Sequence, residues 1–349
     1  MIKVGISHGD INGVSYELII KTFDDIRMYD FCIPVLYGSA KALAYHRKAL
    51  DLNTINTSNI SSAKDAAPNR LNIVNCTSDE ITVDLSKPTK ESEKYAEQAF
   101  EMGIKDLNEG LIDVLVSAPA NLDDIAILEK NSGVKTSGLK ILVKDSFRIA
   151  LATGKMPISE VASKITTEQL TQQLRVLNEV LVKDFMVVAP RIAVLSLNPG
   201  MGLQEKEEGK EEIDIIAPAI QAANEAGVCC FGPYAADSFF GTETYMSFDA
   251  TLAMYYDQGL VPFRSIAYEE GVSYVANLPI ISTSPDLGAS YDNAGKNQTP
   301  TDSFRNAIYL AIDIFNSRNT YLDITKNPLR KQYVSKGSDN EKLDLTKEE

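Results

Sequence analysis

The sequence predicts an α/β fold built on a largely parallel sheet. Short apolar runs of strand length alternate with segments of helical periodicity along almost the whole chain. An alternation of this kind is typical of a mostly parallel sheet that is covered by helices. No internal repeat is present, and 349 residues allow two domains or one large unit with two lobes.

Strands are predicted where short runs are rich in apolar residues. In chain order they cover residues 2–7, 34–37, 72–75, 81–84, 112–117, 147–153, 191–197 and 274–278. The run at 112–117, Ile-Asp-Val-Leu-Val-Ser, is continuous enough to be a buried strand, and it ends in Ala118-Pro119.

Helical periodicity fills most of the intervals between these strands. The predicted helices cover residues 16–27, 40–50, 91–109, 167–182, 211–226, 250–257 and 303–317. Thr166 or Thr167 is the expected cap of the fourth helix. Residues 53–68, which are rich in Ser, Thr, Asn and Ala, are predicted to form a loop. From residue 331 onward the apolar periodicity is lost, which predicts a disordered tail over 331–349.

The composition excludes some classes of partner. The net charge of −14 makes a nucleic acid an unlikely ligand, because DNA and RNA are bound through basic surfaces. No apolar run has the length of a membrane span or the layout of a signal peptide, so we expect a cytoplasmic protein without membrane contact. The four cysteines form no Cys-x-x-Cys pair and are expected to be buried free thiols.

Histidine is unusually scarce in this chain. The only two are His8 and His46, so a metal site with three histidine ligands cannot be built from one copy. His8 follows the first strand and could touch a ligand. His46 lies on a charged helix and is expected at the surface.

Four segments carry most of the functional signal. The first follows the opening strand, where glycines and a helix N-terminus can receive an anion. The others are a Leu-Asn-Pro-Gly-Met-Gly turn, an Ala-Met-Tyr-Tyr-Asp-Gln-Gly-Leu helix start, and a loop rich in Gly, Asp and Asn. In chain order, the four segments cover residues 7–15, 197–202, 252–260 and 283–296.

Together, in this order and spacing, these segments resemble the 4-hydroxythreonine-4-phosphate dehydrogenase (PdxA) family of pyridoxal phosphate (vitamin B6) biosynthesis. The resemblance runs from Ile2 to about Asn316. It implies a two-domain α/β/α fold like that of isopropylmalate dehydrogenase. It also implies a homodimer with an active site in the interdomain cleft. The first lobe would comprise residues 1–125 and 280–330, and the second, which carries the dimer contacts, residues 126–279.

The resemblance implies oxidation of a secondary alcohol by NAD, followed by loss of carbon dioxide. A divalent metal (zinc, cobalt or magnesium) held by three histidines would polarise the developing carbonyl. In this chain the three ligand positions hold Lys155, Gly200 and Tyr256. The sequence therefore predicts a degenerate site that binds no metal. Asp237 and Asp257, with Glu205 and Glu207, leave open a magnesium site, against the alternative of solvated acidic loops.

Two of the residues that replace the metal ligands allow a functional interpretation as well as a structural one. The Lys155 ammonium could stand in for the cation and bind a carboxylate or carbonyl, or it could be solvated or paired with an acid. Tyr256 could donate a proton, or it could serve only in packing.

The substrate side is altered as well. The phosphate-binding positions that the resemblance implies hold Arg264, Ser273 and Ser282, and a lysine position holds Leu122. A substrate-binding loop expected before residue 137 has no counterpart. A phosphate dianion would find few donors here.

The cofactor side is partly retained. The positions kept from the adenosine-binding loop are Gly288, Asp292, Ala294, Gly295 and Lys296. The carboxylates of residues 205–208 would repel a pyrophosphate, which makes NAD binding doubtful.

Two hypotheses follow. The chain is either a catalytically inactive paralogue that acts as a binding or partner subunit, as a homodimer or as a heterodimer with an active relative. Or it is a working NAD-dependent, metal-assisted dehydrogenase that acts on 4-hydroxythreonine 4-phosphate or a related small hydroxy acid.

Overall fold

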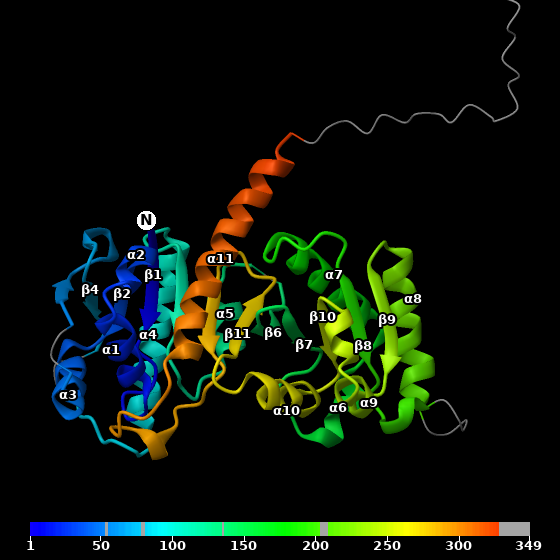
Figure 1. Cartoon of the computed structure of the whole chain (residues 1–349), viewed down its shortest axis with the longest axis horizontal. Coiled ribbons are helices and arrows are strands. Elements are labelled where there is room, and N and C mark those ends of the chain that lie inside the picture. The colour runs from blue at the N-terminus through cyan, green and yellow to red at the C-terminus, as the bar shows by residue number, and fades with distance from the viewer. Residues whose placement is uncertain (53–54, 78–80, 135, 203–208, 328–349) are drawn as a thin grey trace, which may run out of the picture.

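The structure, a computed structural model, describes residues 1–52, 55–77, 81–134, 136–202 and 209–327. Its described strands form one twelve-stranded sheet in the order β3-β4-β2-β1-β5-β12-β11-β6-β7-β10-β8-β9. Figure 1 shows this sheet running through both halves of an elongated molecule. Eight of the eleven strand pairings are parallel. The predicted α/β class with a mostly parallel sheet is confirmed.

The two ends of the sheet are parallel, and its middle is antiparallel. The strands of the first end are β1 (Ile2–Ser7), β2 (Cys32–Gly38), β3 (Thr57–Ile60), β4 (Leu71–Asn75), β5 (Val114–Ser117) and β12 (Ser282–Pro285). Those of the second are β6 (Leu139–Lys144), β7 (Phe147–Leu151), β8 (Arg191–Leu195), β9 (Cys229–Tyr234), β10 (Ala250–Ala253) and β11 (Val272–Ala276). The antiparallel contacts are β12 with β11, β11 with β6, and β6 with β7.

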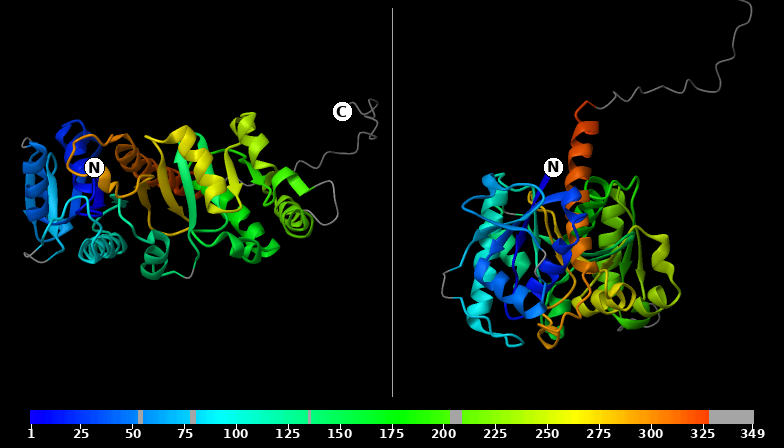
Figure 2. Two further views of the ribbon diagram at one scale, coloured as in Figure 1. Left: turned by 90° about the horizontal axis from the view of Figure 1, so that it is seen from below. Right: turned by 60° about the vertical axis from the view of Figure 1, so that its left-hand side comes forward.

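Helices cover both faces of the sheet (Figures 1 and 2). One continuous apolar core joins one face to α1 (Ser15–Asp24), α3 (Ala40–Leu50), α7 (Thr167–Lys183), α8 (Ala217–Glu225) and α11 (Asp302–Thr325). On the other face, two smaller cores hold α4 (Lys90–Asn108) with α5 (Asp124–Asn131), and α9 (Ala236–Gly241) with α10 (Tyr256–Ala267). Two further short helices are α2 (Met28–Phe31) and α6 (Ile158–Lys164).

Three predictions of local structure were wrong. Residues 250–253 form strand β10 rather than a helix, because they pair with β7 and β8 on both sides and are fully buried. Part of the predicted loop at 53–68 is the edge strand β3, which pairs with β4. Residues 81–84 lie in no strand. Helix α3 has the predicted bounds, and Thr166 caps α7 by accepting from the Gln169 N–H.

The predicted division at residues 125 and 280 stays a prediction. The sheet is continuous across the halves, and α5 runs through residue 125 while packing in the same core as α4. The predicted tail over 331–349 lies outside the described residues. Cys32 and Cys230 are buried as expected, but Cys229 is exposed. Among the described residues, no helix combines the length and apolar character that crossing a bilayer requires.

Candidate functional site

The turn after β1 is held tightly against the end of β5. The Asp10 N–H donates to the Pro119 carbonyl at 2.9 Å, and Ser15 Oγ donates to the same oxygen at 2.5 Å. Gly9 has φ +67°, and a Cβ there would lie 2.5 Å from the Pro119 oxygen. Only glycine fits such a close approach of two backbones. The motif at 7–15 therefore forms a compact, buried turn.

The Asp10 carboxylate is the polar centre of this turn. It is buried, and its Oδ1 accepts from the Asn12 N–H at 2.8 Å. Its Oδ2 accepts from Ser92 Oγ at 3.1 Å and from the Tyr291 hydroxyl at 2.7 Å. Burial and this hydrogen bond to Asp10 raise the pKa of Tyr291. Asp10 thus ties the first turn to α4 and to the loop that was predicted to bind the cofactor.

That predicted cofactor loop also packs directly on the start of α1. The Val14 N–H donates to the Ala289 carbonyl at 3.0 Å, and a Cβ on Gly13 would lie 2.3 Å from the same oxygen. Within the loop Ala294 is buried and Gly295 has φ +75°. The three remaining predicted cofactor residues are exposed and accessible to a ligand: Gly288, Asp292 and Lys296.

Both histidines are buried beneath this turn, which corrects two expectations. His46 is 1% exposed rather than at the surface, and it stacks on Tyr16 with ring centroids 5.0 Å apart. Its Nε2 lies 2.8 Å from the Ile11 carbonyl oxygen. His8 is fully buried, so it does not reach a ligand in this structure. Burial lowers the pKa of each histidine from 6.5 to about 4.

A cavity of about 530 Å³ lies where α5, β6, β7 and α7 approach the start of α10. The polar side chains that line it include Asp124, Lys140, Lys155, Gln169, Gln173 and Tyr256. Lys140 is paired with Asp124 at 3.2 Å. The Lys155 Nζ lies 5.6 Å from the centre of the Tyr256 ring, a cation–π contact. Two of the three predicted metal positions therefore lie side by side.

The other predicted metal residues lie on three different elements. Gly200 lies in the short η2 turn (Pro199–Gly202) with φ +72°, and no atom approaches within 4 Å of a Cβ built there. Asp257 is exposed and lines a second, smaller cavity with Lys155 and Tyr256. Asp237 is exposed on α9. The proposed magnesium ligands Glu205 and Glu207 lie outside the described residues.

None of the predicted phosphate-binding residues is among those that line the Lys155 cavity. Arg264 makes a two-pronged ion pair with Asp286, at 2.9 and 3.0 Å. This pairing holds the pKa of Arg264 above its ordinary value. Ser273 and Ser282 are each 4% exposed, in the central strands β11 and β12. Of the substrate-side positions, Leu122 lines the Lys155 cavity.

Comparison with known proteins decides the family. Residues 30–311 match the family model described as "Pyridoxal phosphate biosynthetic protein PdxA". This chain belongs to the PdxA family. It is 48% identical over 355 aligned positions to the 4-hydroxythreonine-4-phosphate dehydrogenase of Bacteroides thetaiotaomicron, covering 99% of this chain and 97% of that protein.

More distant PdxA relatives agree. The protein of the same name from Prosthecochloris aestuarii is 33% identical, covering 88% of this chain and 95% of its own length. The crystal structure of the enzyme of that name from Klebsiella pneumoniae superposes with a TM-score of 0.77. That match has 23% identity and covers 90% of this chain and 98% of the other. This structural match supports the fold.

The side chains at the metal positions implied by the PdxA resemblance do not suit a divalent ion. A protonated lysine has no lone pair to donate, and glycine has no side chain. Within the described parts of the chain, no group of three or more His, Cys, Asp or Glu side chains is placed to hold a metal. The residues present therefore do not fit the metal of the implied reaction.

Sequence reasoning missed several residues of the cavity. Lys140, Asp124, Gln169 and Gln173 belong to none of the four PdxA-like segments. Gln169 and Gln173 both donate to the Ala152 carbonyl, at 3.2 and 2.9 Å, which fixes that cavity wall. One local signal was available: Lys140 is a charged residue in the apolar run 139–143. The strand formed by that run was not predicted from the sequence.

Proposed function

We propose that this PdxA-family protein is a binding or partner subunit that does not perform metal-assisted dehydrogenation. The observation that carries the proposal is the contact between Lys155 and Tyr256, which stand side by side at two of the metal-ligand positions implied by the resemblance. An ammonium group over an aromatic ring repels a divalent cation instead of binding it.

The same cavity supports a role in binding. Lys140 is neutralised by Asp124, whereas among the described residues no carboxylate lies within ion-pair distance of Lys155. Lys155 is exposed at the wall of a cavity large enough for a small metabolite. We propose that its ammonium receives the carboxylate or carbonyl of a small anionic ligand.

A partner subunit is the second part of the proposal. Ile158 on α6 and Val261 and Tyr268 at α10 are large apolar side chains with at least 61% exposure. Exposed apolar side chains near a cavity are typical of protein interfaces. We propose that this side contacts a second copy or an active relative, in the cytoplasm.

The second candidate function is the alternative: NAD-dependent, metal-assisted oxidative decarboxylation of 4-hydroxythreonine 4-phosphate or a related hydroxy acid. The 48% identity over nearly the full length to a protein named for that activity favours this candidate. The tightly packed loop at 286–296 favours retained NAD binding. Thus overall similarity supports the dehydrogenase, and the donor chemistry at Lys155, Gly200 and Tyr256 supports the binding subunit.

One set of measurements separates the two candidates. The purified protein and the Bacteroides thetaiotaomicron relative are compared for divalent metal content, thermal stabilisation by NAD, and turnover of 4-hydroxythreonine 4-phosphate. The proposal predicts neither metal nor turnover for this chain under conditions where the relative turns over. Turnover that disappears with a chelator and returns with added metal would establish the dehydrogenase instead.

A further inference from the structure

A separate cavity lies on the α7 and α11 face of the sheet, between the β6–β7 turn, the C-terminal end of α7 and α11. Its volume is about 510 Å³, and its charged lining residues are Lys144, Asp145, Arg148, Asp184, Glu270 and Asp313. Arg148 is near the start of β7, whereas Lys155 follows the end of that strand. The two cavities have no lining residue in common. We call this one the Arg148 cavity.

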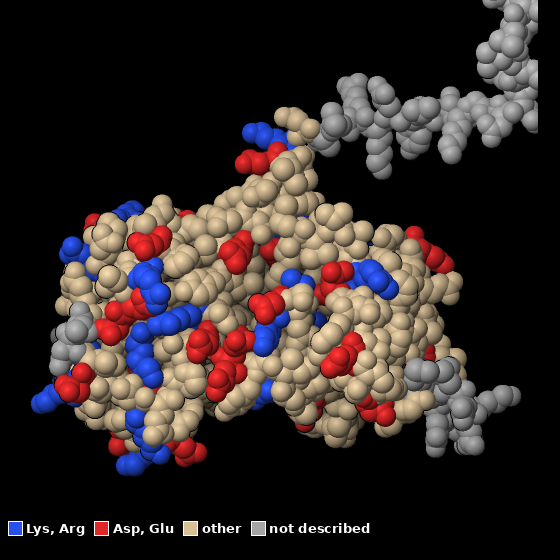
Figure 3. Space-filling model, viewed as in Figure 1, with Lys and Arg blue, Asp and Glu red and all other residues tan. Residues whose placement is uncertain are grey.

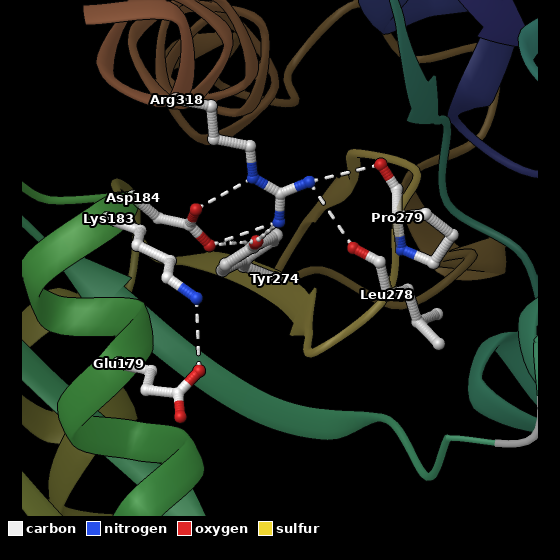
Figure 4. A network of polar contacts seen from close by, with 7 residues as sticks. All are labelled: Glu179, Lys183, Asp184, Tyr274, Leu278, Pro279 and Arg318. Carbon is white, nitrogen blue, oxygen red and sulfur yellow. Dashed lines mark hydrogen bonds and ion pairs between the residues drawn. The ribbon is translucent and has the colours of Figure 1, made fainter. Parts of the chain in front are cut away.

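Three of the charged lining residues are already neutralised within the protein. The Lys144 ammonium lies 2.6 Å from the Glu270 carboxylate. Asp184 accepts from Arg318 Nε at 2.7 Å and also binds the Tyr274 hydroxyl. Figure 4 shows the Asp184 carboxylate held between these two side chains. These charges are therefore not available to a ligand.

The Arg148 guanidinium is not balanced by an ion pair. It lies over the Phe185 ring, 4.5 Å from the ring centre. Its Nη1 donates to the carbonyl oxygens of Ser146 and Asp249 at 3.3 and 3.1 Å, and its Nε is buried without a partner. Burial lowers the pKa of Arg148, and among the described residues the carboxylates of Asp249 and Asp145 act on it only from beyond ion-pair distance. A guanidinium with unused N–H groups can receive a carboxylate.

Asp313 is an unbalanced charge of the opposite sign. It lines the same cavity from α11, whereas Arg148 lines it from the sheet. No side chain in the described part of the chain makes a hydrogen bond or an ion pair with Asp313, and partial burial raises its pKa. A carboxylate that is partly removed from water gains stability when a cation approaches. The cavity thus has a cation and a carboxylate on different walls that do not reach each other.

The rest of the lining is largely apolar. Val143 and Val272 come from the paired strands β6 and β11, and Tyr309 and Leu310 come from α11. Figure 3 shows basic and acidic side chains close together on the face beside α11. The volume is in the range of cavities that bind small molecules. A ligand that fits these walls has opposite charges joined by an aliphatic chain.

We propose that the Arg148 cavity binds a small aliphatic zwitterion, with its carboxylate on Arg148 and its ammonium on Asp313. A ligand with a single charge would leave one of these two side chains unbalanced, whereas a zwitterion satisfies both. The aliphatic chain between the two charges contacts the apolar walls. This site is independent of the proposed function, because it contains neither Lys155 nor Tyr256.

The test is calorimetric titration of the full chain with three zwitterions of increasing charge separation: glycine, γ-aminobutyrate and ε-aminocaproate. At least one of them should bind. The analogues of the same length that lack the ammonium or lack the carboxylate should bind at least about tenfold more weakly, because each loses one charge-assisted contact.

The variant Asp313→Asn separates the two charges. Asp313 is exposed, so the melting temperature should match that of the wild type. The affinity for the zwitterion should fall about tenfold or more, and the affinity for its carboxylate-only analogue should not fall. The matched control Asp323→Asn changes an exposed carboxylate further along α11, outside the cavity, and should keep the wild-type affinity.

Four results would overturn the proposal. In the first, none of the three zwitterions binds. In the second, the carboxylate-only analogue binds as tightly as the zwitterion, which would show a simple anion site. In the third, Asp313→Asn binds the zwitterion like the wild type. In the fourth, binding is lost in Lys155→Ala, which would assign the zwitterion to the Lys155 cavity instead.

Discussion

Two sides of the molecule, that of the first turn and that of the Lys155 cavity, differ in how their side chains are held. On the side of the first turn, Asp10 accepts three hydrogen bonds and links the turn to α4 and to the loop at 286–296. On the other side, Lys155 is exposed and makes a cation–π contact with the Tyr256 ring. The first side is built into the core of the fold, and the second is a cavity wall.

The difference explains how one site can keep its shape while its chemistry changes. Replacement of a residue such as Asp10 would leave buried donors unpaired and destabilise the protein, whereas replacement at an exposed wall costs little. A family member that no longer needs a metal can therefore lose its metal ligands without losing its fold. The following predictions test this contrast, from the largest expected effect to the smallest.

Asp10→Ala should be the most damaging single change. It leaves the Tyr291 hydroxyl and the Asn12 N–H without their acceptor, and it leaves Ser92 Oγ only its second acceptor, the Thr89 carbonyl at 2.9 Å. The expected cost is about 3 kcal/mol in unfolding free energy. Urea denaturation measures this. The control Asp292→Ala, an exposed carboxylate near Tyr291, should change stability by less than about 0.5 kcal/mol. Equal effects of the two substitutions would contradict the contrast.

The buried histidines should make the first side sensitive to acid. Unfolded histidines take up protons near pH 6.5, and the folded ones only near pH 4. Their stabilisation is therefore complete above pH 6.5 and is lost as the pH falls toward 4. The slope is about 1.4 kcal/mol per pH unit for each histidine within this window. His46→Gln should remove about half of their joint contribution to the slope of unfolding free energy between pH 7 and 5. An unchanged slope would show that His46 titrates normally in the folded protein.

Gly13→Ala should displace the loop at 286–296. The added Cβ would lie 2.3 Å from the Ala289 carbonyl, so the backbone must move, at about 2 kcal/mol. Differential scanning calorimetry and limited proteolysis of the loop report this. Gly288→Ala is the matched control, because a Cβ there meets no atom within 4 Å. If both variants melt like the wild type, the loop is not packed as described.

Lys155→Ala should have the smallest effect on stability. The side chain is exposed, and its contact with the Tyr256 ring at 5.6 Å contributes about 0.5 kcal/mol. The free energy of unfolding of the variant, measured by chemical denaturation, should therefore lie within about 0.5 kcal/mol of the wild-type value. A loss of more than about 2 kcal/mol in unfolding free energy would show that Lys155 has a structural role. Substitution at the cavity wall would then not be tolerated at little cost.

The fold class was accessible from the sequence because hydrophobic periodicity reports burial directly. Helix α3 and the Thr166 cap followed from local signals alone. Strand β10 did not, since Ala-Thr-Leu-Ala has no strong strand preference and becomes a strand only by pairing with β7 and β8. Likewise, nothing local shows that His46 is buried, because it faces Tyr16 of another helix.

The candidate site was only partly predictable for a related reason. Motif positions indicated that Lys155 and Tyr256 belong to one site, and they do lie side by side. Lys140, Gln169 and Gln173 reach the same cavity from a strand and a helix that carry no motif. Arg264 was predicted to bind phosphate because it stands at a phosphate-binding position that the resemblance implies. Its ion pair with Asp286, 22 residues away, could not be predicted from the sequence. Tertiary contacts decide which charged groups remain available.

The most direct test of the account is divalent metal binding by calorimetry. Cobalt is titrated into the wild-type protein and into the triple variant Lys155→His, Gly200→His, Tyr256→His, both treated with chelator beforehand. The account predicts no binding by the wild type and one ion per chain in the triple variant, because only imidazoles supply the missing donors. A wild-type protein that binds one ion tightly would contradict the account, as would a folded triple variant that binds none.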